Sequence, residues 1–154
     1  DVESKNTAIP GLTQRAEGMV VVPHDNQIDF WLITQQVNTQ TFAATLINAA
    51  AYTGTFNTTT SGAAPLPTAA AHLGYHPATQ KMAVAPQDAD TDAIILNFNN
   101  ATGVLTFDRT ILNSATPAAN NQSVYDIEWN NNGRYLYLSR HGDSGITGTV
   151  LQYD

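Results

Sequence analysis

The sequence contains no cysteine and few charged residues, and each of these absences excludes a class of protein. Without thiols the chain cannot form a disulfide framework or a thiolate metal site, so its stability has to come from apolar burial and backbone pairing. Only 12% of the residues are charged, about half the usual share. Asn, Thr, Gln and Ser supply most of the polarity, which favours an extracellular or cell-surface protein over a cytosolic enzyme.

Basic residues are especially scarce. Six Lys and Arg stand against thirteen Asp and Glu, a formal net charge of −7. The electrostatic field of this negative net charge repels phosphate backbones and anionic lipid headgroups, so no nucleic-acid partner is expected. No apolar run approaches the roughly 18 to 20 residues that span a bilayer, so no membrane insertion is expected either. The first residues, DVESKNTAIPG, lack the features of a signal peptide, and an export signal is expected upstream or already removed.

The chain repeats itself with a period of about 52 to 55 residues. HLGYHPATQKMAVAP, residues 72–86, parallels YDIEWNNNGRYLYLS, residues 125–139, when Tyr75 is aligned on Trp129. Both segments are typical of a strand, a tight polar turn and a second strand. A more diverged copy is MVVVPHDNQIDFWLIT, residues 19–34.

Each copy is followed by a further apolar run, which we interpret as another strand. These runs are 41–47, 93–99 and 149–154. They are too short for most helices, and β-branched or aromatic residues bracket the turns. One segment leaves an alternative open, because Thr41 to Tyr52 is rich in Ala and would place Phe42, Leu46 and Ala49 on one face of a short helix. The linkers 53–70, 113–122 and 141–148 are rich in Gly, Pro, Thr and Asn, which predicts surface loops.

Repeats of this length, each with three or four short strands, favour an all-β fold: a partial β-propeller of about three blades of antiparallel four-stranded sheet. The blades are expected at approximately residues 16–60, 70–115 and 123–154, within one domain covering 1–154. A blade buries its faces only against neighbours, and a closed ring needs more than three. We therefore expect the propeller to continue beyond both ends, with the remaining blades supplied by the same or another chain.

The same segments resemble a known family. GMVVVPHDNQIDFWLITQQVNTQTFAATLI, then HLGYHPATQKMAVAP with NFNNATGVLTF, then VYDIEWNNNGRYLYLS with VLQYD, is similar to the WD-like propeller of secreted surface proteins from Bacteroidetes. These proteins are associated with gliding motility and type IX secretion. Residues 16–154 fit the family pattern, and Val124 to Tyr153 is its most specific part. Asn130, Asn131 and Asn132 replace the family's usual turn, so the resemblance transfers no ligand site; it implies a non-enzymatic, adhesion-type surface role.

Three Asp residues form the candidate metal site. Asp88, Asp90 and Asp92 stand at alternate positions of PQDADTDA, and such carboxylates can converge on a hard cation such as Ca²⁺. Ala93 and Asn99 replace the Gly and Glu of an EF-hand loop, and a solvated loop is the alternative. The sequence indicates no cofactor other than this calcium ion.

Other groupings of chemically active residues have weaker support. On a strand His72 and His76 lie about 13 Å apart, too far to share one metal. His141, Asp143 and Ser144 lie within one Gly-rich loop, which does not suit a catalytic triad. Glu128 has no evident acidic partner for a glycosidase pair. We therefore predict no catalytic residues.

The sequence thus predicts a non-enzymatic module that binds or scaffolds a surface protein or glycan. Two alternatives stay open. One is a propeller-type extracellular hydrolase or lyase, and the other is a fragment that completes a larger surface assembly.

Overall fold

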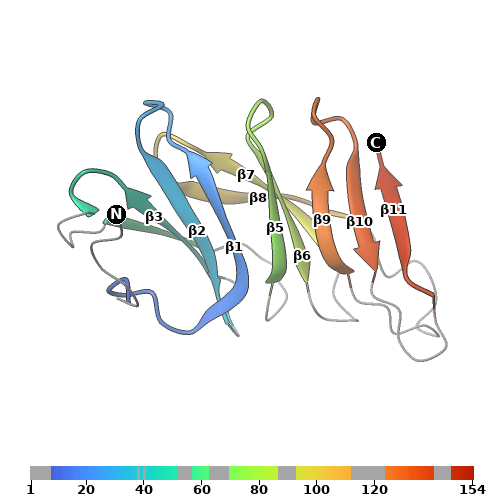
Figure 1. Cartoon of the computed structure of the whole chain (residues 1–154), viewed down its shortest axis with the longest axis horizontal. Helices are drawn as coiled ribbons and strands as arrows, with labels where there is room; N and C mark the ends of the chain where they lie inside the picture. Colours follow the sequence, from blue (N-terminus) through green and yellow to red (C-terminus); the bar gives the residue numbers. More distant parts are fainter. Residues whose placement is uncertain are drawn as a thin grey trace, which may run out of the picture.

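The computed structural model describes residues 8–37, 39, 41–51, 57–62, 70–86, 93–111, 124–140 and 147–154 of the chain. The described residues form an all-β structure of three antiparallel sheets (Figure 1). The strands are β1 (Arg15–Pro23), β2 (Phe30–Gln36), β3 (Thr41–Ile47), β4 (Asn57–Gly62), β5 (Ala70–His76), β6 (Lys81–Pro86), β7 (Ala93–Asn99), β8 (Val104–Ile111), β9 (Val124–Trp129), β10 (Leu136–Arg140) and β11 (Thr149–Tyr153). None of the described residues belongs to a helix long and apolar enough to cross a membrane.

Each sheet is a simple up-and-down meander in which neighbours along the chain are neighbours in space. Sheet A has the order β1-β2-β3-β4 and sheet B the order β5-β6-β7-β8. Sheet C has three strands among the described residues, in the order β11-β10-β9, where the sequence predicts four. The predicted all-β class with antiparallel sheets is confirmed.

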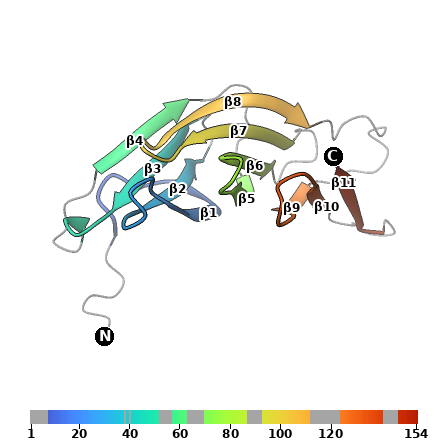
Figure 2. The same ribbon diagram turned by 90° about the horizontal axis from the view of Figure 1, so that it is seen from above.

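The three sheets stack face to face, with sheet B in the middle. β1 lies beside β5 and β5 beside β9, while β4 lies against β8. Seen from above, β1, β5 and β9 follow one side of the molecule, and the later strands of each sheet lead away from that side (Figure 2). The described sheets form an open stack and do not close on themselves.

Alternation along the strands of sheet B produces two hydrophobic cores. Met82 and Val84 of β6 belong to the core shared with sheet A, while Ala83 and Ala85 belong to the core shared with sheet C. Because successive side chains of a strand point to opposite faces, one strand can contribute to both cores. The core between sheets A and B contains the larger side chains. Its fully buried members include Phe42, Ile33, Leu96 and Phe98.

The interpretation of residues 41–47 as a strand is confirmed, and the prediction that residues 57–62 lie in a loop is wrong. Thr41–Ile47 is strand β3 and not the alternative helix, since Phe42 and Ala44 face sheet B in alternation and Ala43 is also buried. Asn57–Gly62 was expected in a surface loop but forms strand β4. Its Thr side chains suit a strand, and Thr58 Oγ1 lies 3.0 Å from Thr45 Oγ1 on the neighbouring strand.

The first hairpin of each sheet has the same register. Val21 pairs with Leu32, Leu73 with Val84, and Ile127 with Leu138. The number of residues between the partners is 10 in each case, since 32 − 21, 84 − 73 and 138 − 127 all equal 11. This register also aligns Tyr75 with Trp129, as the sequence comparison does.

Sheets B and C also share an irregularity in their first strands. In β5 the partners change from Ala70–Pro86 to His72–Ala85. In β9 they change from Val124–Arg140 to Asp126–Ser139. One residue is therefore left unpaired in each strand, at the same distance from the hairpin turn, as in a β-bulge.

Candidate binding rim

Four turns come together at one end of the stacked sheets, and we call this end the rim. They are residues 24–29 between β1 and β2, 77–80 between β5 and β6, 100–103 between β7 and β8, and 130–135 between β9 and β10. The three first-hairpin turns stand at the upper edge in Figure 1. Loops that a rigid sheet holds in place are frequent binding surfaces, so the rim is the candidate binding site.

The first and last of these turns are built alike. His24 N donates to Asp29 O at 2.9 Å, and Asn130 N donates to Tyr135 O at 2.8 Å. Inside each loop a second bond of 3.0 Å closes a tight turn, from Gln27 N to His24 O and from Gly133 N to Asn130 O. Gln27 and Gly133 occupy the same place in the two turns, and both have positive φ, 59° and 70°.

An Asn side chain holds each of these two turns from within. Asn26 Oδ1 accepts from the backbone N of Ile28 and of Asp29, both at 3.0 Å. Asn132 Oδ1 accepts from Arg134 N at 3.0 Å. Asn is suited to this position because its short side chain can bond to backbone groups two or three residues further on. The turns are thus fixed by their own sequence, 106 residues apart.

Asn100 joins sheets A and B across the rim. Its carbonyl oxygen accepts from Trp31 Nε1 at 2.7 Å and from Asp25 N at 3.2 Å. Its side-chain Oδ1 accepts from Gln80 Nε2 at 3.2 Å. One residue therefore links three other segments, and the Trp31 indole can be buried because its N–H is satisfied.

Glycine is required beside Trp31. A Cβ on Gly103 would lie 2.8 Å from the Trp31 ring, and Gly103 has a φ of +73°. On the other side of this indole, the His24 ring stacks with its centroid 5.5 Å away and an interplanar angle of 21°. The indole thus fills the space between two turns of the rim, and the two turns hold each other in place.

His76 joins sheets B and C. It is buried, and its Nε2 lies 3.2 Å from Asn131 O. A carbonyl only accepts, so we assign the proton to Nε2, which leaves Nδ1 to accept from Thr79 Oγ1 at 3.3 Å. A Cβ on Gly133 would lie 2.6 Å from His76 Nδ1. This histidine is therefore a structural link between turns 77–80 and 130–135.

His72 is also engaged with sheet C. Its Nδ1 lies 3.1 Å from Asp126 Oδ1, and both side chains are about half exposed. His72 and His76 face the same neighbouring sheet but contact different residues of it.

The outer side chains of the rim combine amides with exposed apolar groups. Ile28 at the tip of the first turn is 78% exposed, and Phe30 beside it is 45% exposed. Asn131 and Asn132 are exposed on the last turn. Amides offer both donors and acceptors, and exposed apolar groups offer contact area, which is the chemistry of protein and glycan binding.

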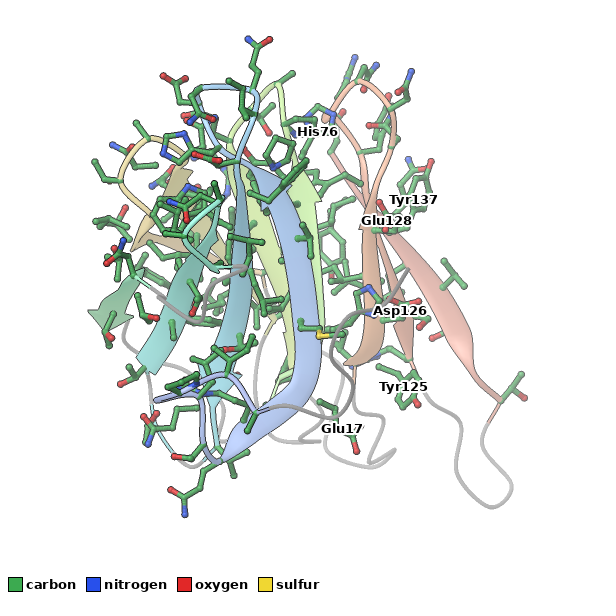
Figure 3. All side chains as sticks on the ribbon, turned by 60° about the vertical axis from the view of Figure 1, so that its left-hand side comes forward. Glu17, His76, Tyr125, Asp126, Glu128 and Tyr137 are labelled. Atoms are coloured by element: carbon green, nitrogen blue, oxygen red, sulfur yellow. The ribbon has the colours of Figure 1, made fainter. Side chains whose placement is uncertain are left out.

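Strand β9 carries two acidic residues at alternate positions, a pairing that the sequence interpretation missed. Asp126 and Glu128 stand two residues apart on this strand, and Tyr137 of β10 pairs directly with Glu128 (Figure 3). Alternate residues of a strand share a face and lie roughly 7 Å apart. The alternate positions of Asp126 and Glu128 on one strand were the sequence signal that could have identified Asp126 as a neighbouring carboxylate of Glu128. Asp126 Oδ1 lies 3.1 Å from His72 Nδ1, so this carboxylate already has a partner.

The remaining predicted site residues lie outside the described part of the chain. These are the candidate calcium ligands Asp88, Asp90 and Asp92, and the loop residues His141, Asp143 and Ser144. Within the described ranges no group of three or more His, Asp or Glu side chains is arranged to hold a metal ion.

Comparisons of this chain with models of protein families, with curated proteins and with solved structures found no match.

Proposed function

We propose that the chain is a sector of a β-propeller that acts as a non-enzymatic binding or scaffolding module of a secreted or cell-surface protein, with the rim as its contact surface. The observation that carries the proposal is the stacking of three antiparallel meanders with their first strands side by side. Radial repetition of such sheets is the architecture of a propeller.

Corresponding positions in the three sheets support the repeated design. Leu73 of sheet B is 2% exposed and faces sheet A, and Ile127 of sheet C is 1% exposed and faces sheet B. Val21 holds the same place in sheet A and is 59% exposed. The face of sheet A around Val21 is thus apolar where the other sheets are covered, and a further blade is the natural cover for it.

The cross-linked turns favour a binding role for the rim. Bonds through Asn100 and His76 connect all three sheets at this end. A rim that is ordered before it meets a ligand loses little entropy on binding. The low share of charged residues and the resemblance to WD-like propellers of Bacteroidetes surface proteins support a location outside the cell.

A pair of rim substitutions tests the proposed contact surface. Ile28 is exposed, and Asn131 bonds to His76 through its backbone oxygen. The variant Ile28→Ser with Asn131→Ser should therefore keep the fold. We expect the native chain to bind members of an array of neutral and acidic polysaccharides and purified extracellular proteins. The double variant should bind them at least about tenfold more weakly, the loss of about 1.4 kcal/mol.

Val150→Ser is the matched control, because Val150 is 71% exposed but lies on β11. It should leave binding unchanged. Equal binding by the rim variant, or no binding by the native chain, would contradict the proposed surface. Cleavage of a polysaccharide that is lost in Glu128→Gln would instead support the alternative of an extracellular hydrolase or lyase.

A further inference from the structure

A lysine, an asparagine and an aspartate meet on sheet B. Lys81 Nζ donates a hydrogen bond to Asn97 Oδ1 at 2.5 Å and lies 3.1 Å from Asp108 Oδ2. The three side chains come from three successive strands, β6, β7 and β8. An amine, a carboxamide and a carboxyl group in contact are the two reactants and the proton carrier of an amide exchange, in which the amine displaces ammonia from the carboxamide.

The pairing of β6 with β7 holds the amine beside the carboxamide. Lys81 pairs directly with Asn97, and directly opposed residues of antiparallel strands point to the same face with their Cβ atoms about 4.5–5.5 Å apart. The carbon that the amine would attack, Asn97 Cγ, is one bond from the Oδ1 atom that Lys81 contacts. Groups held together in this way react as if at an effective concentration of about 10⁵–10⁸ M when their geometry is right.

A register shift in β8 brings the carboxylate to the same place. Asp108 is an additional residue between two paired positions, since Leu96 pairs with Phe107 and Ile95 pairs with Arg109. An extra residue of this kind, as in a β-bulge, re-aims a side chain. The carboxylate therefore contacts the lysine across β7, although β8 and β6 are not neighbouring strands.

The proton transfer that the reaction needs has a short path. Only the neutral amine is nucleophilic, and Asp108 Oδ2 is near enough to take a proton from the Lys81 ammonium directly. The side chains of Lys81 and Asp108 are 25% and 27% exposed, so both are partly shielded from water. Arg109 Nε lies farther from the same oxygen, at 3.5 Å, and its side chain is 68% exposed. Lys81 is therefore the nearer and more buried partner of the carboxylate.

We propose that Lys81 and Asn97 become joined by an amide bond, with Asp108 as the general acid and base. Asp108 takes a proton from the Lys81 ammonium, and the free amine attacks Asn97 Cγ. The Nζ–Cγ bond forms and the Cγ–Nδ2 bond breaks. Two protons pass from Nζ to Nδ2 through the carboxyl group, so the nitrogen leaves as ammonium and Asp108 is again a carboxylate. The reaction consumes no oxidant, reductant or cofactor.

The cross-link would tie β6 to β7 in a chain that has no cysteine for a disulfide. It closes the segment 81–97 into a covalent loop, which restricts the unfolded chain and so raises stability. A reaction that each molecule undergoes once can be slow and still reach completion. The proposal goes beyond the binding function and does not rest on it.

Mass spectrometry of the intact, denatured chain tests the proposal, because the reaction removes one ammonia. We expect the chain to be about 17 Da lighter than its sequence requires, and tandem spectra of a protease digest should contain two peptides joined through Lys81 and Asn97. Two variants should keep the full sequence mass. In Lys81→Arg the guanidinium keeps its proton and cannot attack, and in Asp108→Ala the proton carrier is gone.

Arg109→Gln is the matched control, because it changes the residue next to Asp108 but none of the reacting groups, and it should lose the same mass as the native chain. A native chain with the full sequence mass would overturn the proposal without any variant, so the test does not depend on how the variants fold. A loss of mass that persists in Lys81→Arg or Asp108→Ala would also overturn it, because an asparagine that closes on its own backbone loses ammonia without either group. None of these results involves binding at the rim, so failure here and failure of the proposed function are distinguishable.

Discussion

Sheets B and C approach each other closely at Gly74, and a single methyl group added there should force the two sheets apart. A Cβ built on Gly74 would lie 2.8 Å from the backbone oxygen of Ile127. Real Cβ atoms do not come this close to backbone oxygen, and neither strand can yield alone because both are paired within their own sheets. The substitution Gly74→Ala therefore has to shift sheet C as a body.

The expected cost combines two losses and one gain. Overpacking of a tight contact costs about 1–3 kcal/mol. The shift also lengthens the hydrogen bond from Trp129 Nε1 to Gly74 O, now 3.2 Å, which contributes about 1 kcal/mol. Replacing glycine stiffens the unfolded chain and returns roughly 0.5 kcal/mol. We expect Gly74→Ala to lower the free energy of unfolding by about 1.5–3.5 kcal/mol.

Urea denaturation followed by circular dichroism measures this free energy. Gly11→Ala is the control, because a Cβ on Gly11 meets no atom within 4 Å. Its only cost is the backbone strain of an alanine at a positive φ of 79°, about 1–2 kcal/mol. Nuclear magnetic resonance should locate the shift changes of Gly74→Ala on β9 and β5. Loss of stability no greater than in the control, with unshifted β9 resonances, would refute the close contact of the two sheets.

Three other changes test separate parts of the structure. Arg134→Gln should return the pKa of Asp154 toward its ordinary value, because the guanidinium bond now holds it lower; the pair's stabilisation is present above the unfolded-state pKa and is lost as pH falls through the folded one, which a carboxyl titration by NMR can follow. Trp31→Phe removes the N–H that bonds to Asn100 O and should cost about 2 kcal/mol in denaturant unfolding, whereas no loss would contradict the bridge. Phe98→Ala opens a cavity in the core between sheets A and B and should cost about 4 kcal/mol in the same assay; a cost under about 1 kcal/mol would show that this core is not close-packed.

Much of the strand pattern could be predicted from the sequence because short β-branched and aromatic runs alternate with polar turns. The hairpins around residues 24–29, 77–80 and 130–135 are of this kind. The wrong prediction at β4 has a physical cause. β4 consists of Asn, Thr, Ser and Gly and looks like a loop, but its neighbour β3 is a paired strand whose edge it covers. Such pairing depends on a tertiary partner, and local composition does not reveal it.

The links across the rim could not be predicted for a different reason. The bonds from Trp31 to Asn100 and between His76 and Asn131 use backbone oxygens, which every residue has, so no side-chain pattern marks these links between sheets. Gly133 is a partial exception, since a glycine after three asparagines does indicate a turn with positive φ. That the same glycine also makes room for His76 follows only from the packing of two sheets.

Cysteine labelling at corresponding positions tests the central claim most directly, because the native chain contains no cysteine. Leu73→Cys and Ile127→Cys place a thiol on covered faces of sheets B and C, and Val21→Cys places it at the matching position of sheet A. We predict that a maleimide reacts with the Val21 variant at close to the rate of a free peptide and with the other two only as fast as the sheets separate. Equally fast labelling at all three positions, in variants whose circular dichroism is native, would contradict a stack of like sheets.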